Sequence, residues 1–469
     1  MRALLISTYD LGRQPFGLAS PAAWLRTAGI DVECVDASRS PVTDEQLRAA
    51  SLIAFYLPMH TATRLAAPLI DRAHQVNPSA RLCAYGLYAP LNADWLRERG
   101  ITDVLGPESE RSLVELASPS IPKRTSSPES PIPSLESSTP SPKPSAQGLP
   151  RLQFIQPDRT GLPALKEYAS LRMPDGTRRI MGSADATRGC KHLCRHCPIV
   201  PVYNGQFRVV PVDVVLEDIR SQVAAGAQHV SFGDPDFLNG PAHARRIVER
   251  MSREFPGLSY DVTIKIEHLL QHSAVIPLLR DTGCLFITSA VEAIDDRVLE
   301  HLRKGHTRSD FVEVAGLCRR AGVILVPTFV PFTPWTSLSG YVELLDLLED
   351  QELVEHVAPI QLAIRLLVTS GSPLLDLPDI CEVVAPFDPA SLTWPWRHRD
   401  PRVDALQADV MRLVMASTAS ARTALFGAIS DVAHEHAGQP ASARMMTSGT
   451  PVPYVSEPWY CCAEPMEAL

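Results

Sequence analysis

The sequence lacks long hydrophobic runs and any excess of positive charge. No stretch approaches the roughly 18 consecutive apolar residues that a membrane-spanning helix needs. The 469 residues carry a formal net charge of −9, so a general basic surface for nucleic acid or anionic membranes is absent. The amino terminus also shows no secretory signal. We therefore expect a cytoplasmic protein that binds neither nucleic acid nor membranes.

A glycine-rich dinucleotide motif is missing from the first 117 residues. Short apolar runs there alternate with amphipathic stretches, and the runs lie at residues 3–7, 31–35, 52–57, 82–85 and 102–105. This alternation predicts an α/β domain with a parallel, doubly wound sheet of Rossmann type. Because no Gly-x-Gly-x-x-Gly sequence follows the first run, a dinucleotide site is not supported.

Composition divides the rest of the chain. Residues 118–150 are rich in proline and serine and poor in large apolar side chains, which predicts a disordered linker. Residues 151–182 are a connecting segment before a core domain at 183–384, and a helical extension with an irregular tail follows at 385–469. The core domain has candidate strands at residues 184–187, 229–232, 260–265, 285–289, 323–330 and 360–366. Six strand–helix units predict a partial (βα)6 barrel with its chemistry at the carboxyl ends of the strands.

Three of the ten cysteines, Cys190, Cys194 and Cys197, lie in one Cys-x3-Cys-x2-Cys loop after the first of these strands. This spacing lets three thiolates bind one iron–sulfur cluster. Most clusters use four cysteines, so one iron without a protein ligand would be open to a substrate. Two alternatives stay open: a zinc site that recruits His192 or His196, and cysteines that are buried small apolar groups.

With this loop, residues 180–375 resemble the radical S-adenosylmethionine (SAM) superfamily. The resemblance implies a [4Fe-4S] cluster on the three cysteines and SAM as the ligand of its open iron. It implies that His196 lies against the adenine and that Gly233 and Asp234 form the turn that receives the SAM ammonium group. It also implies that Ser289 and Glu292 lie near the ribose. A small-molecule substrate and a low-potential electron donor, flavodoxin or ferredoxin, are the partners implied.

The first domain resembles the cobalamin-binding domain of one large subgroup of this superfamily. The ligand signature of that subgroup is Asp-x-His-x-x-Gly. The corresponding loop here, residues 8–15, has an aspartate and a glycine but no histidine. The sequence therefore argues against cobalamin as a cofactor.

Two adjacent cysteines, Cys461 and Cys462, stand near the end of the chain. A disulfide between neighbours is strained, so such a pair suits the binding of a thiophilic centre or thiol exchange; two incidental cysteines at a frayed terminus are the alternative. The tail resembles radical SAM proteins named for a terminal Cys-Cys-Ala-Glu-Pro motif, with relatives in arsenic-linked pathways. That resemblance implies transfer of an aminocarboxypropyl group to trivalent arsenic, as in arsinothricin biosynthesis, with both thiols as a catalytic holder. The second hypothesis is a thiol-based metal or metalloid binder whose barrel is catalytically silent.

Overall fold

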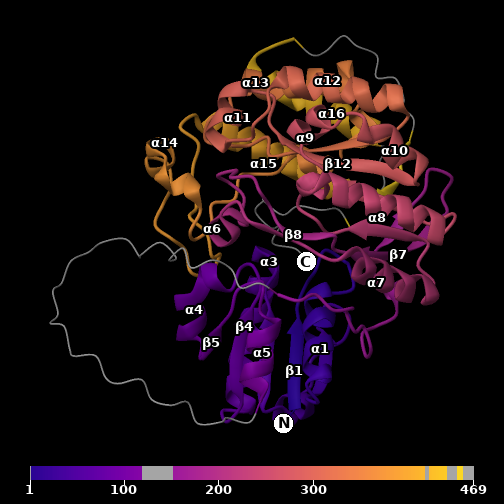
Figure 1. Ribbon diagram of the computed structural model, residues 1–469. Helices are drawn as coiled ribbons and strands as arrows, with labels where there is room; N and C mark the ends of the chain where they lie inside the picture. Colours follow the sequence, from indigo (N-terminus) through magenta and orange to yellow (C-terminus); the bar gives the residue numbers. More distant parts are fainter. Residues whose placement is uncertain (1, 119–151, 418–421, 441–450, 458–469) are drawn as a thin grey trace.

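The computed structural model describes residues 2–118, 152–417, 422–440 and 451–457. The described residues contain two large, mainly parallel sheets, one at each end of the molecule in Figure 1, and a two-stranded antiparallel sheet. The domain boundaries stay predictions, because residues 119–151 lie outside the described part of the chain. Within that part, no helix is long and apolar enough to cross a membrane.

The N-terminal unit is a five-stranded parallel sheet in the order β2-β1-β3-β4-β5. Its strands are β1 (Arg2–Ser7), β2 (Asp31–Asp36), β3 (Leu52–Tyr56), β4 (Arg81–Tyr85) and β5 (Asp103–Val104). Its helices are α1 (Phe16–Thr27), α2 (Asp44–Ala49), α3 (His60–Val76), α4 (Ala93–Glu98) and α5 (Glu110–Ala117), with a 3-10 turn η1 (Pro90–Asn92). Because α1 and α5 cover one face of the sheet and α2, α3 and α4 cover the other, the strands are apolar on both sides. The predicted doubly wound domain is confirmed.

The second unit is a curled seven-stranded sheet in the order β13-β12-β11-β10-β7-β6-β14. Five strands are parallel: β7 (Arg178–Ala184), β10 (His229–Phe232), β11 (Ser259–Thr263), β12 (Cys284–Glu292) and β13 (Ile324–Phe329). The edge strands β6 (Ser170–Arg172) and β14 (Tyr454–Val455) are antiparallel. The covering helices are α7 (Val212–Ala224), α8 (Pro241–Glu254), α9 (Ile266–Gln271), α10 (Val275–Asp281), α11 (Asp296–Leu302), α12 (Arg308–Ala321) and α13 (Leu338–Asp350). The predicted partial barrel is confirmed as a fold class.

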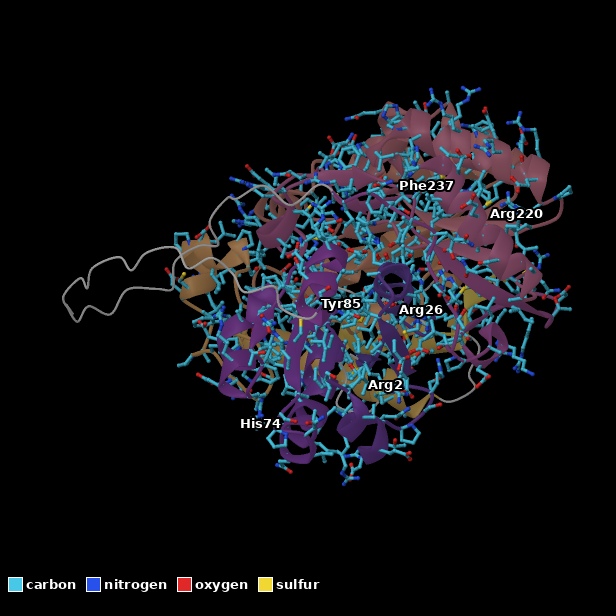
Figure 2. All side chains as sticks on the ribbon, turned by 60° about the horizontal axis from the view of Figure 1, so that its bottom comes forward. Arg2, Arg26, His74, Tyr85, Arg220 and Phe237 are labelled. Carbon is cyan, nitrogen blue, oxygen red and sulfur yellow. The ribbon has the colours of Figure 1, made fainter. Side chains whose placement is uncertain are left out.

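Short elements connect these parts. They are β8 (Thr187–Gly189), β9 (Phe207–Val209), α6 (Val200–Tyr203), α14 (Pro378–Cys381), η2 (Leu165–Glu167), η3 (Phe237–Asn239), η4 (Val354–His356), η5 (Pro359–Leu362) and η6 (Pro373–Asp376). The largest buried side chains, Tyr85 and Phe237 among them, fill the two units, whereas Arg220 extends to the surface (Figure 2).

The structure differs from the expected strands at two places. Residues 184–187 are not one strand: β7 ends at Ala184, and β8 pairs with β9 instead. The buried carboxylate of Asp234 causes this break, because it accepts hydrogen bonds from the Ala186 N–H and the Thr187 hydroxyl and turns the chain out of the sheet. Residues 360–366 contribute only η5 and an isolated bridge between Phe332 and Arg365.

The C-terminal extension packs on the barrel. Helices α15 (Pro401–Ala416) and α16 (Arg422–Ala437) lie in the helical extension expected at residues 385–469. The described residues 451–457 return to the barrel, where β14 extends the sheet beside β6 and the Val452 side chain is buried. Figure 1 shows α15 and α16 close to the barrel helices α12 and α13, and apolar side chains of both pack into the barrel core.

Candidate active site

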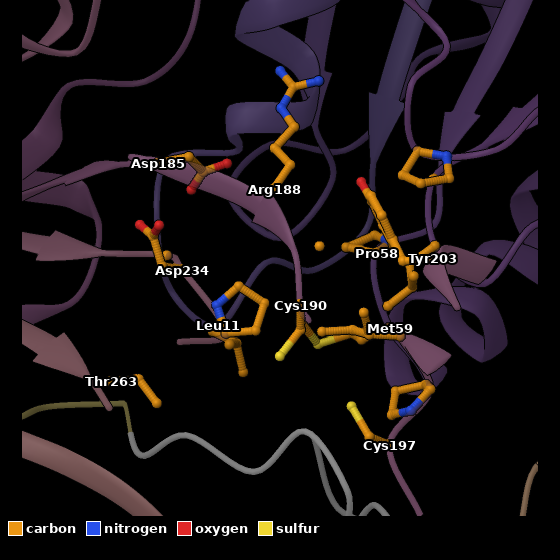
Figure 3. A pocket seen from close by; sticks show the side chains of 18 of the residues that line it. Leu11, Pro58, Met59, Asp185, Arg188, Cys190, Cys197, Tyr203, Asp234 and Thr263 are labelled. Atoms are coloured by element: carbon orange, nitrogen blue, oxygen red, sulfur yellow. The ribbon is translucent and has the colours of Figure 1, made fainter. Parts of the chain in front are cut away.

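One cavity of about 330 Å³ lies between the two sheets. Its walls are the carboxyl ends of strands and the loops that follow them, from β1, β3, β4 and β5 of the N-terminal unit and from β7, β8, β10, β11, β12 and β13 of the barrel. Figure 3 shows Leu11 and Met59 of the N-terminal unit around the same space as Thr263 of the barrel. Ligands of parallel α/β sheets bind at the carboxyl ends of the strands, so both sheets contribute a binding edge to one cavity.

The cysteine loop enters this cavity directly after β8. Cys190, Cys194 and Cys197 all line it, and Figure 3 shows the sulfur atoms of Cys190 and Cys197 pointing into the same space. Gly189 starts the loop with φ +79°, and a Cβ there would lie 2.3 Å from the Tyr203 ring, so only glycine fits. Burial raises the pKa of the Cys190 thiol to about 11. Without a metal the Cys190 thiol therefore keeps its proton, and a metal ion that binds there must displace it.

The two histidines of the loop have partners of their own. His196 is buried, and its Nε2 lies 3.1 Å from Glu292 Oε1. His192 Nε2 lies 3.3 Å from Asp236 Oδ2. Both histidines therefore contact carboxylates of the barrel.

Glu292 connects His196 to a lysine that the sequence did not single out. Lys304 Nζ lies 3.3 Å from Glu292 Oε1, and all three side chains are buried at the cavity wall. Burial would raise the pKa of Glu292, but Lys304 and the His196 hydrogen bond lower it to about 2. Glu292 ends β12 with φ +71°, a conformation that costs a non-glycine residue about 1–3 kcal/mol. The site thus holds an ionised, buried carboxylate.

The predicted turn after β10 also reaches the cavity. Gly233 and Asp234 line it, and a Cβ on Gly233 would lie 2.4 Å from Asp185 Oδ1. Figure 3 shows Asp185 and Asp234 close together at one wall of the cavity. Burial is the main cause that raises the pKa of Asp234 to about 8, and the nearby Asp185 carboxylate adds to the rise. Its two oxygens accept hydrogen bonds from Ala186 and Thr187, so Asp234 positions the start of the cysteine loop.

The remaining predicted site residues lie elsewhere. Ser289 is buried within β12 and does not line the cavity, and its Oγ has no hydrogen-bond partner among the described residues. Cys461 and Cys462 fall outside the described residues.

Arg188 is a site residue that sequence reasoning missed. It lies on β8, two residues before Cys190, and its side chain crosses into the N-terminal unit. There Nη1 lies 2.7 Å from Glu110 Oε1 and Nη2 lies 3.0 Å from Ser20 Oγ. No spacing pattern in the sequence pairs residues 78 positions apart, so this connection between the two units appears only in the tertiary structure.

A second cavity of about 480 Å³ lies against the inner face of the barrel sheet. Ser231, Asp261 and Thr288 line it, and Glu457 lines it from the C-terminal segment. Thr263 is one of several residues that line both cavities. A substrate in the barrel would thus lie next to ligands of the first cavity.

Comparison with known proteins identifies the barrel. Residues 186–348 match the family model of the radical SAM superfamily. This part of the chain is a radical SAM domain. The radical SAM fold with its cysteine loop, predicted from the sequence, is thereby confirmed.

Three of the curated relatives are, by name, a methylthiotransferase, a methyltransferase and a methylase. The uS12 methylthiotransferase RimO of Parabacteroides distasonis is 26% identical over 176 residues, which are 34% of this chain and 39% of RimO. The bacteriochlorophyllide d C-12(1)-methyltransferase of Chlorobaculum tepidum is 29% identical over 26% of this chain and 27% of its own length. The hopanoid C-3 methylase of Methylococcus capsulatus is 26% identical over 34% of this chain and 30% of its own length. The chain thus spans well under half the length of each.

Two solved structures share most of the fold. The cobalamin-dependent radical SAM enzyme OxsB, with aqua-cobalamin and SAM bound, has a TM-score of 0.64 at 13% identity and covers 88% of this chain and 66% of its own. The radical SAM methyltransferase TsrM from Kitasatospora setae, with cobalamin and a [4Fe-4S] cluster bound, has a TM-score of 0.56 at 16% identity. It covers 75% of this chain and 70% of its own.

These structures overturn the argument against cobalamin. The N-terminal domain and barrel of this chain have the architecture of two cobalamin-dependent enzymes. The missing histidine in residues 8–15 concerns one axial ligand only, so its absence does not exclude the cofactor.

Proposed function

We propose that this protein is a radical SAM enzyme of the methyl-transferring type that uses a [4Fe-4S] cluster, SAM and cobalamin. The observation that carries the proposal is the shared cavity, into which the three cluster cysteines and the binding edges of both parallel sheets open. The names of the relatives support group transfer, since they are methylthiotransferases, methyltransferases and a methylase.

The residues fit the cluster. Cys190, Cys194 and Cys197 line one cavity wall within a single loop, and Asp234 fixes the backbone at the start of that loop. When bound and reduced, the cluster supplies one electron to the sulfonium of SAM. The protein holds the thiolates, excludes water and orients the bound SAM.

The buried wall beside the cysteines suits the nucleoside and amino acid parts of SAM. Glu292 is ionised there, so it can accept a hydrogen bond from a ribose hydroxyl while Lys304 balances its charge. His196 offers a planar ring for the adenine. Gly233 lets a ligand approach the backbone of the turn after β10. We propose these four residues as the SAM site.

The N-terminal wall offers cobalamin an apolar patch beside the ionisable Asp10, Arg13 and Glu110. Phe16, Tyr56, Pro58 and Met59 line the cavity there. No histidine of residues 2–118 lines it, so cobalamin would be held without an imidazole from this side. When bound, cobalamin supplies a cobalt atom that can carry a methyl group.

We propose that the acceptor is a small molecule that binds in the second cavity. Transfer to trivalent arsenic rests on Cys461 and Cys462, which lie outside the described residues, and no relative named above is named for arsenic chemistry. A flavodoxin or ferredoxin as electron donor stays a prediction.

Anaerobic reconstitution tests the proposal. We expect about four iron and four sulfide per chain, one bound cobalamin, and SAM cleavage after reduction, followed by mass spectrometry of the products. The triple variant Cys190→Ala/Cys194→Ala/Cys197→Ala should lose cluster and cleavage but keep cobalamin, and Cys381→Ala, an exposed cysteine, is the matched control. Zinc binding without SAM cleavage would favour the thiol-based binder instead.

A further inference from the structure

We propose that His192, Asp236 and His268 form a second metal site, for a single divalent transition ion such as Zn²⁺ or Fe²⁺. The three residues come from three separate elements of the barrel. His192 lies in the cysteine loop, Asp236 in the turn after β10, and His268 on α9, which follows β11. None of them is a cysteine of the cluster loop, so the site is distinct from the cluster.

The donor atoms already converge. His268 Nδ1 lies 2.6 Å from Asp236 Oδ2, and His192 Nε2 lies 3.3 Å from the same oxygen. One ligand atom of each residue lies within 4.8 Å of the other two. An ion with tetrahedral bonds of 2.0–2.1 Å holds its ligand atoms about 3.3–3.4 Å apart. The three atoms need only small shifts to surround such an ion.

Hydrogen bonding does not account for this cluster. Asp236 Oδ2, His268 Nδ1 and His192 Nε2 are buried and lie within ion-pair distance, yet none of them makes a hydrogen bond of acceptable geometry among the described residues. Buried polar atoms are almost always satisfied, and exceptions call for an unseen partner. The other carboxylate oxygen, Oδ1, accepts the Leu238 N–H at 3.0 Å, which fixes the direction of Oδ2. A cation at the centre would satisfy all three atoms.

The residues behind His192 are arranged like those that orient the ligands of a metal site. The other ring nitrogen of His192, Nδ1, lies 3.5 Å from Glu267 Oε2, and Lys265 Nζ lies 3.2 Å from the same oxygen. A carboxylate behind a ligating imidazole commonly orients the ring. Two imidazoles with one carboxylate suit Zn²⁺ or Fe²⁺, whereas Mg²⁺ and Ca²⁺ prefer oxygen ligands.

An ion here would act on the cluster loop. Asp236 and His268 are 0% and 1% exposed, so both are fixed in the barrel, whereas His192 belongs to the loop between Cys190 and Cys194. The ion would therefore tie the cluster loop to the barrel. This role does not depend on the proposed reaction.

The test is metal analysis of the reconstituted full chain after exposure to Zn²⁺ and gel filtration. We expect one zinc per chain beside the cluster iron in the wild type, and at least a 100-fold weaker zinc affinity in His268→Ala with cluster iron and sulfide retained. His272→Ala is the matched control, because its ring lies 5.9 Å from that of His268 without belonging to the trio. X-ray absorption should show zinc bonded only to nitrogen and oxygen at about 2.0–2.1 Å.

Two further variants keep the test decisive if His268→Ala does not fold. His192→Ala changes a side chain that is 13% exposed and should lose zinc equally. A chain with the three cluster cysteines replaced by serine should still bind one zinc. The proposal is overturned if the wild type binds no zinc, if His272→Ala loses as much as His268→Ala, or if sulfur at about 2.3 Å surrounds the zinc.

Discussion

Replacing Lys304 by methionine is the sharpest test of the electrostatics in the candidate active site. The substitution keeps most of the side-chain volume but removes the ammonium group 3.3 Å from Glu292 Oε1. Glu292 stays buried, with only His196 to balance its charge. We expect the protein to lose stability and the pKa of Glu292 to rise.

The magnitude follows from the geometry. Two unit charges 3.3 Å apart attract by about 5 kcal/mol at an effective dielectric constant near 20. Removing one partner of a buried pair costs about 3–5 kcal/mol, because the other charge stays buried. His196 compensates part of this, so we take about 3 kcal/mol. At about 2–4 °C per kcal/mol, the thermal midpoint of the unit should fall by about 6 °C or more.

The pKa of Glu292 also predicts how the stability of wild type and variant depends on pH. In the wild type the folded pKa of Glu292 is about 2, below the value of about 4.3 in unfolded chains, so its stabilisation is complete above pH 4.3 and is lost toward pH 2. In Lys304→Met burial raises this pKa, so the difference between wild type and variant should grow as the pH rises from 4 to 8.

Thermal unfolding of the metal-free protein, followed by circular dichroism at several pH values, is the assay. Lys166→Met removes an exposed lysine and serves as the control. The double variant Lys304→Met/Glu292→Gln should recover part of the loss, because no charge remains buried. Equal shifts for Lys304→Met and Lys166→Met, or no recovery in the double variant, would refute the reasoning.

Two further substitutions probe neighbouring charges. Asp234 has a pKa of about 8 in the folded protein against about 4 in unfolded chains, so the protein loses stability as the pH rises between these values. Between pH 6 and 8 the thermal midpoint of Asp234→Asn should therefore fall less than that of the wild type. Equal falls would contradict the raised pKa. Arg188→Met leaves Glu110 buried without its 2.7 Å partner, so we expect a cost of about 3–5 kcal/mol and faster proteolysis between the two units. The exposed Arg111→Met is its control, and indistinguishable cleavage rates would argue against the connection.

The expectation against cobalamin rests on a single absence, the histidine missing from residues 8–15. The architecture shared with OxsB and TsrM carries more weight, because a binding face is built from several loops at once. The first of these loops contributes Asp10 and Leu11 to the cavity without any histidine.

Local sequence patterns predicted those parts of the protein that depend on neighbours along the chain. Apolar runs alternating with amphipathic helices predicted both α/β units, and the spacing of Cys190, Cys194 and Cys197 predicted the cluster loop. These signals are local, since strand and helix periods and a loop of eight residues do not depend on distant contacts. Even here a carboxylate distant in the sequence changes the local structure, because Asp234 breaks the strand expected at residues 184–187.

The pairing of charged groups could not be predicted from the sequence, because it depends on the three-dimensional fold. Lys304 reaches Glu292, Arg188 reaches Glu110, and Asp236 lies between two histidines from other elements. Such contacts depend on strand register and on the docking of two units, which bring together residues 12 to 78 positions apart. Burial raises the pKa of both Glu292 and Asp234, but Lys304 and His196 lower that of Glu292 to about 2, whereas the Asp185 carboxylate adds to the rise of Asp234, to about 8.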